Sequence, residues 1–74
     1  MNLESLRVHL NNLGISKSRY SLDGGVPNEK LCLEVSENGT WHIYYSERGG
    51  KTTMSYWLEE SAACQEFLKL LLGE

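Results

Sequence analysis

Residues 40–46 read Thr-Trp-His-Ile-Tyr-Tyr-Ser, and this segment predicts its own structure more clearly than any other part of the chain. Successive side chains of a β-strand point to opposite faces. His42 and Tyr44 therefore share one face, and the other face carries Trp41, Ile43 and Tyr45. Aromatic and β-branched residues are also favoured in strands. The segment predicts a strand that lies with one face against an apolar core.

The segment before it repeats the same alternation. In residues 31–35, Cys32 and Glu34 share one face, and the opposite face carries Leu31, Leu33 and Val35. The intervening Ser-Glu-Asn-Gly sequence at residues 36–39 is typical of a turn, because Asn and Gly tolerate turn conformations. These two strands are therefore expected to pair in an antiparallel hairpin.

A third long strand is predicted over residues 51–58, after the turn sequence Glu-Arg-Gly-Gly. Its register stays open, because two alternations fit the pattern. Either Met54, Tyr56 and Leu58 point toward the core, or Trp57 does.

Two amphipathic helices flank the strands. Residues 2–13 predict the first helix, because leucines recur at intervals of three and four, at Leu3, Leu6, Leu10 and Leu13. Asn2 can cap its start, and Gly14 can end it in the left-handed conformation. Residues 60–72 predict the second helix, which ends at Gly73 and carries a stripe of Cys64, Phe67, Leu68 and Leu71.

These elements predict one α+β domain spanning residues 1–74. It consists of an N-terminal helix, a three- or four-stranded antiparallel meander and a C-terminal helix, with both helices on one face of the sheet. The fourth strand is a short edge strand at residues 20–22, followed by turn residues. A chain of this length buries only about 60% of its unfolded surface, so its core is small. Binding a partner over the surface is therefore favoured over catalysis in a deep cleft.

The charge of the chain argues against a nucleic-acid ligand. Ten acidic and seven basic residues give a formal net charge of −3, whereas proteins that bind phosphate backbones are basic. Residues 1–19 carry a formal charge of +2, which leaves −5 for residues 20–74. An acidic surface steers association with a basic partner, although acidity also serves solubility alone.

The sequence predicts a cytoplasmic protein without a membrane segment. It does not begin with the basic and then apolar stretch of a signal peptide, and its longest apolar run is far shorter than a membrane span. Cys32 and Cys64 are expected to be unpaired thiols. Neither cysteine lies in a metal-binding spacing, and His9 and His42 are isolated. We therefore expect no metal and no cofactor.

A mixed polar and aromatic surface is the candidate binding site. If the leucines of the strands face the helices, the opposite face presents Cys32, Glu34, His42 and Tyr44, with Glu37 and Glu47 near the strand ends. Trp57 joins this face in one of the two registers of the third strand. Aromatic residues supply contact area at low entropic cost, and carboxylates can meet a basic partner. The plainer interpretation is that His42 and Tyr44 merely pair across strands. A hydrolase that uses Cys32 and His42 is a further alternative, although no third orienting group is visible.

Several motifs resemble those of small bacterial immunity proteins, the inhibitors that accompany polymorphic and contact-dependent growth-inhibition toxins. The residues that carry the resemblance are Tyr20, Leu22, Pro27-Asn28-Glu29, Leu31-Cys32-Leu33, Trp41, Tyr44-Tyr45, Glu47-Arg48-Gly49, Glu60, Ala63-Cys64 and Phe67. The resemblance implies a cytoplasmic, non-enzymatic protein that binds one toxin domain, frequently a nuclease, and blocks its active site. The main alternative is a general protein-interaction or accessory domain without a toxin partner.

Overall fold

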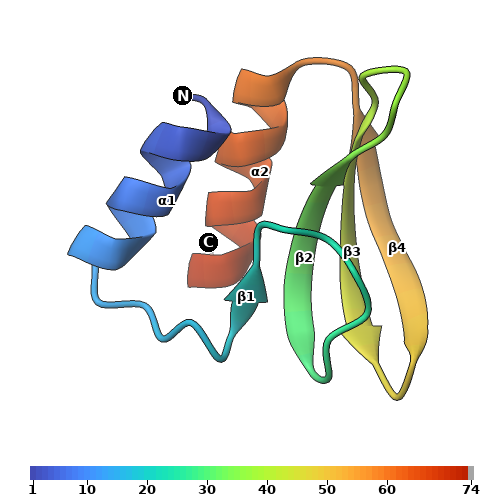
Figure 1. Cartoon of the computed structure of the whole chain (residues 1–74). Coiled ribbons are helices and arrows are strands. Elements are labelled where there is room, and N and C mark those ends of the chain that lie inside the picture. Colours follow the sequence, from blue (N-terminus) through green and yellow to red (C-terminus); the bar gives the residue numbers. More distant parts are fainter. Residues whose placement is uncertain (74) are drawn as a thin grey trace.

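The computed structural model describes residues 1–73, in which a helix, four strands and a second helix follow one another (Figure 1). These elements are α1 (Leu3–Asn12), β1 (Tyr20–Ser21), β2 (Lys30–Val35), β3 (Trp41–Glu47), β4 (Gly50–Trp57) and α2 (Glu60–Leu72). The predicted α+β class is confirmed. Each element lies within one residue of its predicted bounds at either end.

The ends of α1 follow the local signals in the sequence. The side chain of Asn2 accepts a hydrogen bond from the backbone nitrogen of Ser5 at 2.8 Å, and the Ser5 hydroxyl accepts one from the Asn2 backbone. Gly14 adopts the left-handed conformation with φ of 73°, and the nitrogen of Ile15 donates to the carbonyl of Leu10. This closure satisfies carbonyls that would otherwise lack partners at the end of the helix.

One strand of the sheet runs in a direction that the sequence did not predict. The strand order is β1-β2-β3-β4, and β2, β3 and β4 pair antiparallel as expected, whereas β1 pairs with β2 in parallel. The expected antiparallel meander is therefore wrong for the β1 pair. Residues 22–29 return the chain across the sheet, so β2 begins at the same end as β1 (Figure 1).

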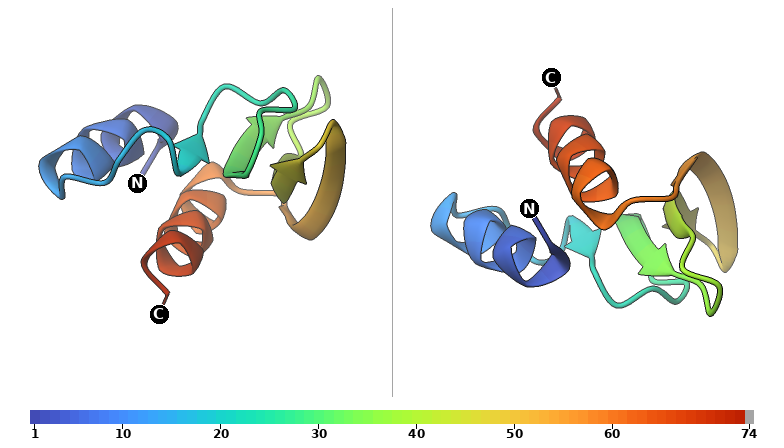
Figure 2. Two further views of the ribbon diagram at one scale, coloured as in Figure 1. Left: turned by 90° about the horizontal axis from the view of Figure 1, so that it is seen from below. Right: turned by 90° about the horizontal axis from the view of Figure 1, so that it is seen from above.

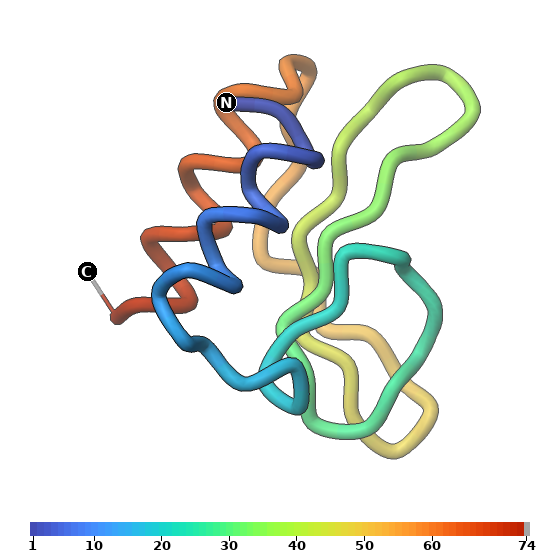
Figure 3. The backbone as a smooth tube through the Cα atoms, turned by 60° about the vertical axis from the view of Figure 1, so that its left-hand side comes forward, coloured from blue at the N-terminus to red at the C-terminus, as the bar shows by residue number. Residues whose placement is uncertain are grey.

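The two helices lie side by side but take different positions relative to the sheet (Figures 1 and 3). α2 packs against β3 and β4, and α1 packs mainly on α2, beyond the β1 edge of the sheet (Figure 2). Thus α2 covers one face of the sheet. The prediction that both helices lie on that face is wrong for α1, which lies beyond the edge of the sheet. A carboxylate of Glu60 accepts a 2.8 Å hydrogen bond from the nitrogen of Leu3, which joins the starts of the helices.

A single apolar core fills the space between α1, α2 and the sheet. Its buried residues are Leu6, Leu10, Tyr20, Leu22, Leu31, Leu33, Ile43, Ala63, Cys64, Phe67 and Leu71. The predicted burial of Leu31, Leu33 and Ile43 is therefore confirmed, although Val35, at the end of β2, remains 48% exposed. Within residues 1–73, neither helix is long and apolar enough to cross a membrane.

A β-bulge settles the register that the sequence left open. Ile43 pairs with Ser55, whereas the next residue, Tyr44, pairs with Thr53, so Met54 has no partner on β3. The bulge interrupts the alternation of side chains along β4. Beyond it, Trp57 packs against the core, and Tyr56 lies on the opposite side with 63% of its surface exposed.

Candidate functional site

The outer face of the sheet, defined as the side away from α2, is partly covered by residues 22–29 (Figure 2). It carries Cys32, Glu34, His42, Tyr44, Lys51, Thr53 and Tyr56. The hydroxyl of Tyr44 donates a 2.6 Å hydrogen bond to the carbonyl of Gly25 in the covering loop. Gly24 has φ of 71°, and a Cβ there would lie 2.9 Å from Oε1 of Glu34. Glycine thus permits the loop to approach the sheet closely.

The carboxylate of Glu34 is the centre of the polar contacts on the outer face. Its Oε2 lies 3.3 Å from Nδ1 of His42 and 3.3 Å from Nζ of Lys51. Its Oε1 lies 3.3 Å from the hydroxyl of Tyr44. Nζ of Lys51 also lies 4.6 Å from the centre of the Tyr44 ring, a cation–π geometry. These contacts link β2, β3 and β4 through side chains alone.

The imidazole of His42 is held by contacts at both of its nitrogens. Nδ1 faces Glu34, and Nε2 lies 2.9 Å from the hydroxyl of Thr53. In the tautomer with its proton on Nδ1, His42 donates to Glu34 and accepts from Thr53. The ring of Tyr56 stacks on this imidazole, with 4.5 Å between ring centres and 15° between planes. An exposed aromatic side chain is therefore supported by an ordered polar network.

Two residues expected on this surface are buried instead. Tyr44 and Cys32 each have 0% of their surface exposed. The loop of residues 22–29 accounts for this, because it covers part of the outer face, which was predicted to be open. Burial raises the pKa of the Cys32 thiol, and its hydrogen bond goes to the carbonyl of Lys30. Tyr44 therefore supports the site from within and does not present a contact surface.

The predicted acidic residues do not form a single cluster. Glu34 makes internal contacts with His42 and Lys51. Glu37 is exposed in the turn between β2 and β3, and Glu47 is exposed at the end of β3, at the opposite end of the sheet (Figure 1). Of the two exposed carboxylates, Glu37 lies at the end of the sheet that also carries Tyr56, because Tyr56 pairs with His42 near the start of β3.

His42 contacts the carboxylate of Glu34 on one side and the hydroxyl of Thr53 on the other. The same three types of group, a carboxylate, a histidine and a hydroxyl, are linked in this way in catalytic triads. Hydrolysis would also require a substrate cavity and oxyanion donors beside the hydroxyl. Three cavities, beside Arg7, Met54 and Gln65, are lined by residues other than His42 and Thr53. Within residues 1–73, Cys32 and His42 do not hydrogen-bond, and no cluster of three potential metal-binding side chains occurs. The contacts of Glu34, His42 and Thr53 therefore favour a role in positioning the Tyr56 ring over a role in hydrolysis.

The Glu34 network predicts a loss of stability in acid. Partial burial would raise the pKa of Glu34, but hydrogen bonds from His42 and Lys51, together with the Lys51 charge, hold it below its ordinary value of 4.5. Because the folded pKa is the lower one, ionised Glu34 stabilises the protein above pH 4.5, and this contribution disappears as pH falls through the folded pKa. The free energy of unfolding of Glu34→Gln should be below wild type at about pH 7, and the difference should shrink at about pH 3.

Urea unfolding of both proteins at each pH measures this difference. Glu37→Gln is the matched control, because it removes one exposed carboxylate outside the network. A Glu34→Gln difference that stayed constant with pH would contradict the assigned contacts of Glu34.

No pattern in the sequence predicts Lys51, Thr53 and Tyr56 as members of the site. Their positions depend on the register of β4, which the bulge at Met54 changes in the middle of the strand. A Gly-containing turn and a run of strand-forming residues predict β4 but give no signal for an unpaired residue within it.

Comparison with known proteins finds no matching family model, no matching curated protein and no matching solved structure. A function for the chain is therefore inferred from its own residues.

Proposed function

We propose that the protein is an immunity protein that binds and neutralises a cognate bacterial toxin domain by stoichiometric contact. The observation that carries the binding role is the side chain of Tyr56, which is 63% exposed and yet stacked on His42. The motif resemblance to immunity proteins supplies the class of partner.

The geometry of Tyr56 fits that of a binding hot spot. Ordering a free side chain at an interface costs roughly 0.5–1.5 kcal/mol, which reduces affinity. Stacking on His42, which is itself held by Glu34 and Thr53, orders the Tyr56 ring before any partner arrives. Tyrosine is also among the residues most enriched at hot spots.

The surroundings of Tyr56 favour a partner with both apolar and basic groups. Leu58, which follows β4, is 85% exposed. Glu37 and Glu59 are exposed at the same end of the sheet (Figure 1). Carboxylates around an apolar centre fit a polar rim that guides a basic surface into contact. A nuclease domain, which must attract phosphates, has a basic surface that these carboxylates would meet.

The proposal is tested with the toxin domain encoded next to the gene for this protein. The purified toxin domain and the protein should form a one-to-one complex, and coexpression should restore growth of cells that produce the toxin. Tyr56→Ala should weaken binding by roughly 2 kcal/mol or more, equivalent to about 30-fold in Kd. Titration calorimetry measures the affinity.

Leu13→Ala is the matched control, because Leu13 is 48% exposed at the end of α1, away from β4. Equal losses of affinity for the two variants would contradict a contact centred on Tyr56. Absence of a neighbouring toxin gene, with capture of an unrelated protein from the native host, would favour the general interaction domain instead.

A further inference from the structure

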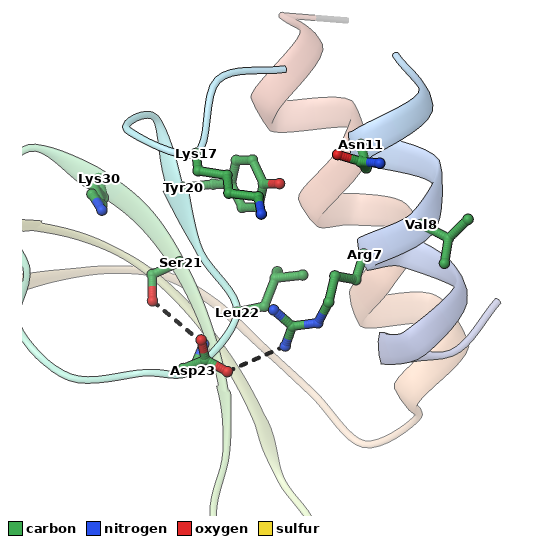
Figure 4. A pocket seen from close by; sticks show the side chains of 9 residues that line it. All are labelled: Arg7, Val8, Asn11, Lys17, Tyr20, Ser21, Leu22, Asp23 and Lys30. Atoms are coloured by element: carbon green, nitrogen blue, oxygen red, sulfur yellow. Dashed lines mark hydrogen bonds and ion pairs between the residues drawn. The ribbon is translucent and has the colours of Figure 1, made fainter. Parts of the chain in front are cut away.

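A second feature of the molecule is a pocket of about 580 Å³ between α1 and β1 (Figure 4). Its apolar part comes from Leu22, which is buried, and Val8, which is 53% exposed. This volume is within the range of roughly 300–1,000 Å³ that is typical of small-ligand sites. The pocket lies at the opposite edge of the sheet from β4.

The charge of the pocket is opposite to that of the protein. Arg7, Lys17 and Lys30 line it, and Asp23 is its single carboxylate. Its formal charge is therefore +2, whereas the whole chain has a formal charge of −3. Among residues 1–73, Lys17 and Lys30 form no ion pair, and Arg7 pairs only with Asp23, at 3.2 Å.

The pocket is lined by cationic and hydroxyl groups that come from separate elements. In Figure 4, the ammonium group of Lys17 lies beside the hydroxyl of Tyr20, and the side-chain oxygen of Asn11, an acceptor, faces them from α1. The guanidinium of Arg7 lies beside Leu22 and points to Asp23, and Lys30 lies apart from the other cations, at the far side of the pocket. A guanidinium presents parallel N–H donors that match the two oxygens of a carboxylate. The existing contact with Asp23 shows that a carboxylate can occupy this position at Arg7.

We propose that this pocket binds an organic carboxylate, with a short dicarboxylate as its simplest ligand. One carboxylate of the ligand pairs with Arg7 and the other with Lys17 or Lys30, and the Leu22 and Val8 side chains contact the carbon chain between them. The carboxylate can come from a free organic acid or from an acidic side chain of a partner protein. The site does not depend on the proposed immunity function.

Asp23 competes with a ligand carboxylate for Arg7, because it already pairs with the guanidinium. Its side chain is 80% exposed, so the ion pair contributes little to stability. Asp23→Asn removes the competing carboxylate and raises the charge of the pocket to +3. A ligand carboxylate should therefore bind Asp23→Asn severalfold more tightly than it binds wild type.

The test is a titration of the isotope-labelled protein with sodium glutarate, followed by amide chemical shifts at low ionic strength. Saturable shifts are expected for residues 7–11, 17 and 20–23. Glutaramide, the neutral analogue, should cause none. The double variant Lys17→Gln with Lys30→Gln should weaken glutarate binding by about tenfold or more.

Arg48→Gln with Lys69→Gln is the matched control, because it changes the net charge equally at exposed positions outside the pocket. Thermal unfolding checks that every variant folds. Shifts that do not saturate, equal weakening in the two double variants, or weaker binding by Asp23→Asn would each overturn the proposal.

The same variants distinguish the two sources of the carboxylate. If a partner's acidic side chain occupies the pocket, the Lys17 and Lys30 variant also loses affinity for that partner, and glutarate competes with it. If the ligand is a free acid, partner affinity is unchanged while glutarate binding is still lost.

Discussion

Replacing Phe67 by alanine should lower the free energy of unfolding by about 3–5 kcal/mol. Phe67 is fully buried in α2 and belongs to the same core as Ile43 of β3. Truncation removes the contacts that hold α2 against the sheet and leaves a cavity. A domain of this size has roughly 5 kcal/mol of stability to lose, so a large part of the variant should be unfolded.

Denaturant unfolding followed by circular dichroism measures this loss. Lys69→Ala, an exposed substitution on the same helix, should change the stability by no more than about 0.5 kcal/mol. An unchanged melting temperature for Phe67→Ala would remove α2 from the core and would contradict the architecture.

Replacing Tyr44 by alanine should have an effect of similar size, about 3–5 kcal/mol, because Tyr44 is the largest of the fully buried side chains. Tyr44→Phe separates the two roles of this residue. It keeps the ring but removes the hydroxyl that donates to Gly25, and it should cost about 0.5–1.5 kcal/mol because this hydrogen bond is lost while the exposed carbonyl of Gly25 can accept from water. Amide exchange in residues 24–26 should also become faster, since this hydrogen bond ties the loop to the sheet.

Tyr45→Phe is the control for Tyr44→Phe. Tyr45 is half-buried on the other side of β3, and within the described chain its hydroxyl makes no hydrogen bond. Equal losses of stability for both substitutions would show that the loop is not anchored by Tyr44. Together the two substitutions test whether the hydroxyl of Tyr44 holds the loop of residues 22–29 against the outer face.

Local patterns in the sequence predict the helices and strands of the fold and their order. Alternation predicted the three long strands, and the spacing of apolar residues predicted both helices. Asn2 and Gly14 marked the ends of α1 because capping needs a side-chain acceptor at the start and a left-handed residue at the end. All of these signals act over a few neighbouring residues, which is why they could be read without a structure.

Contacts between residues distant in the sequence determine which parts of the sheet are covered and which are exposed. The parallel β1 pair, the loop over Tyr44 and the bulge at Met54 each depend on contacts between residues distant in the sequence. They bury two of the residues predicted to be exposed, and they bring Tyr56 onto the ring of His42. The pocket between α1 and β1 has the same origin, because Arg7, Lys17 and Lys30 meet only when the helix packs beside the first strand. Periodicity reports which side of an element is apolar, whereas the long-range packing of the elements determines which side chains meet.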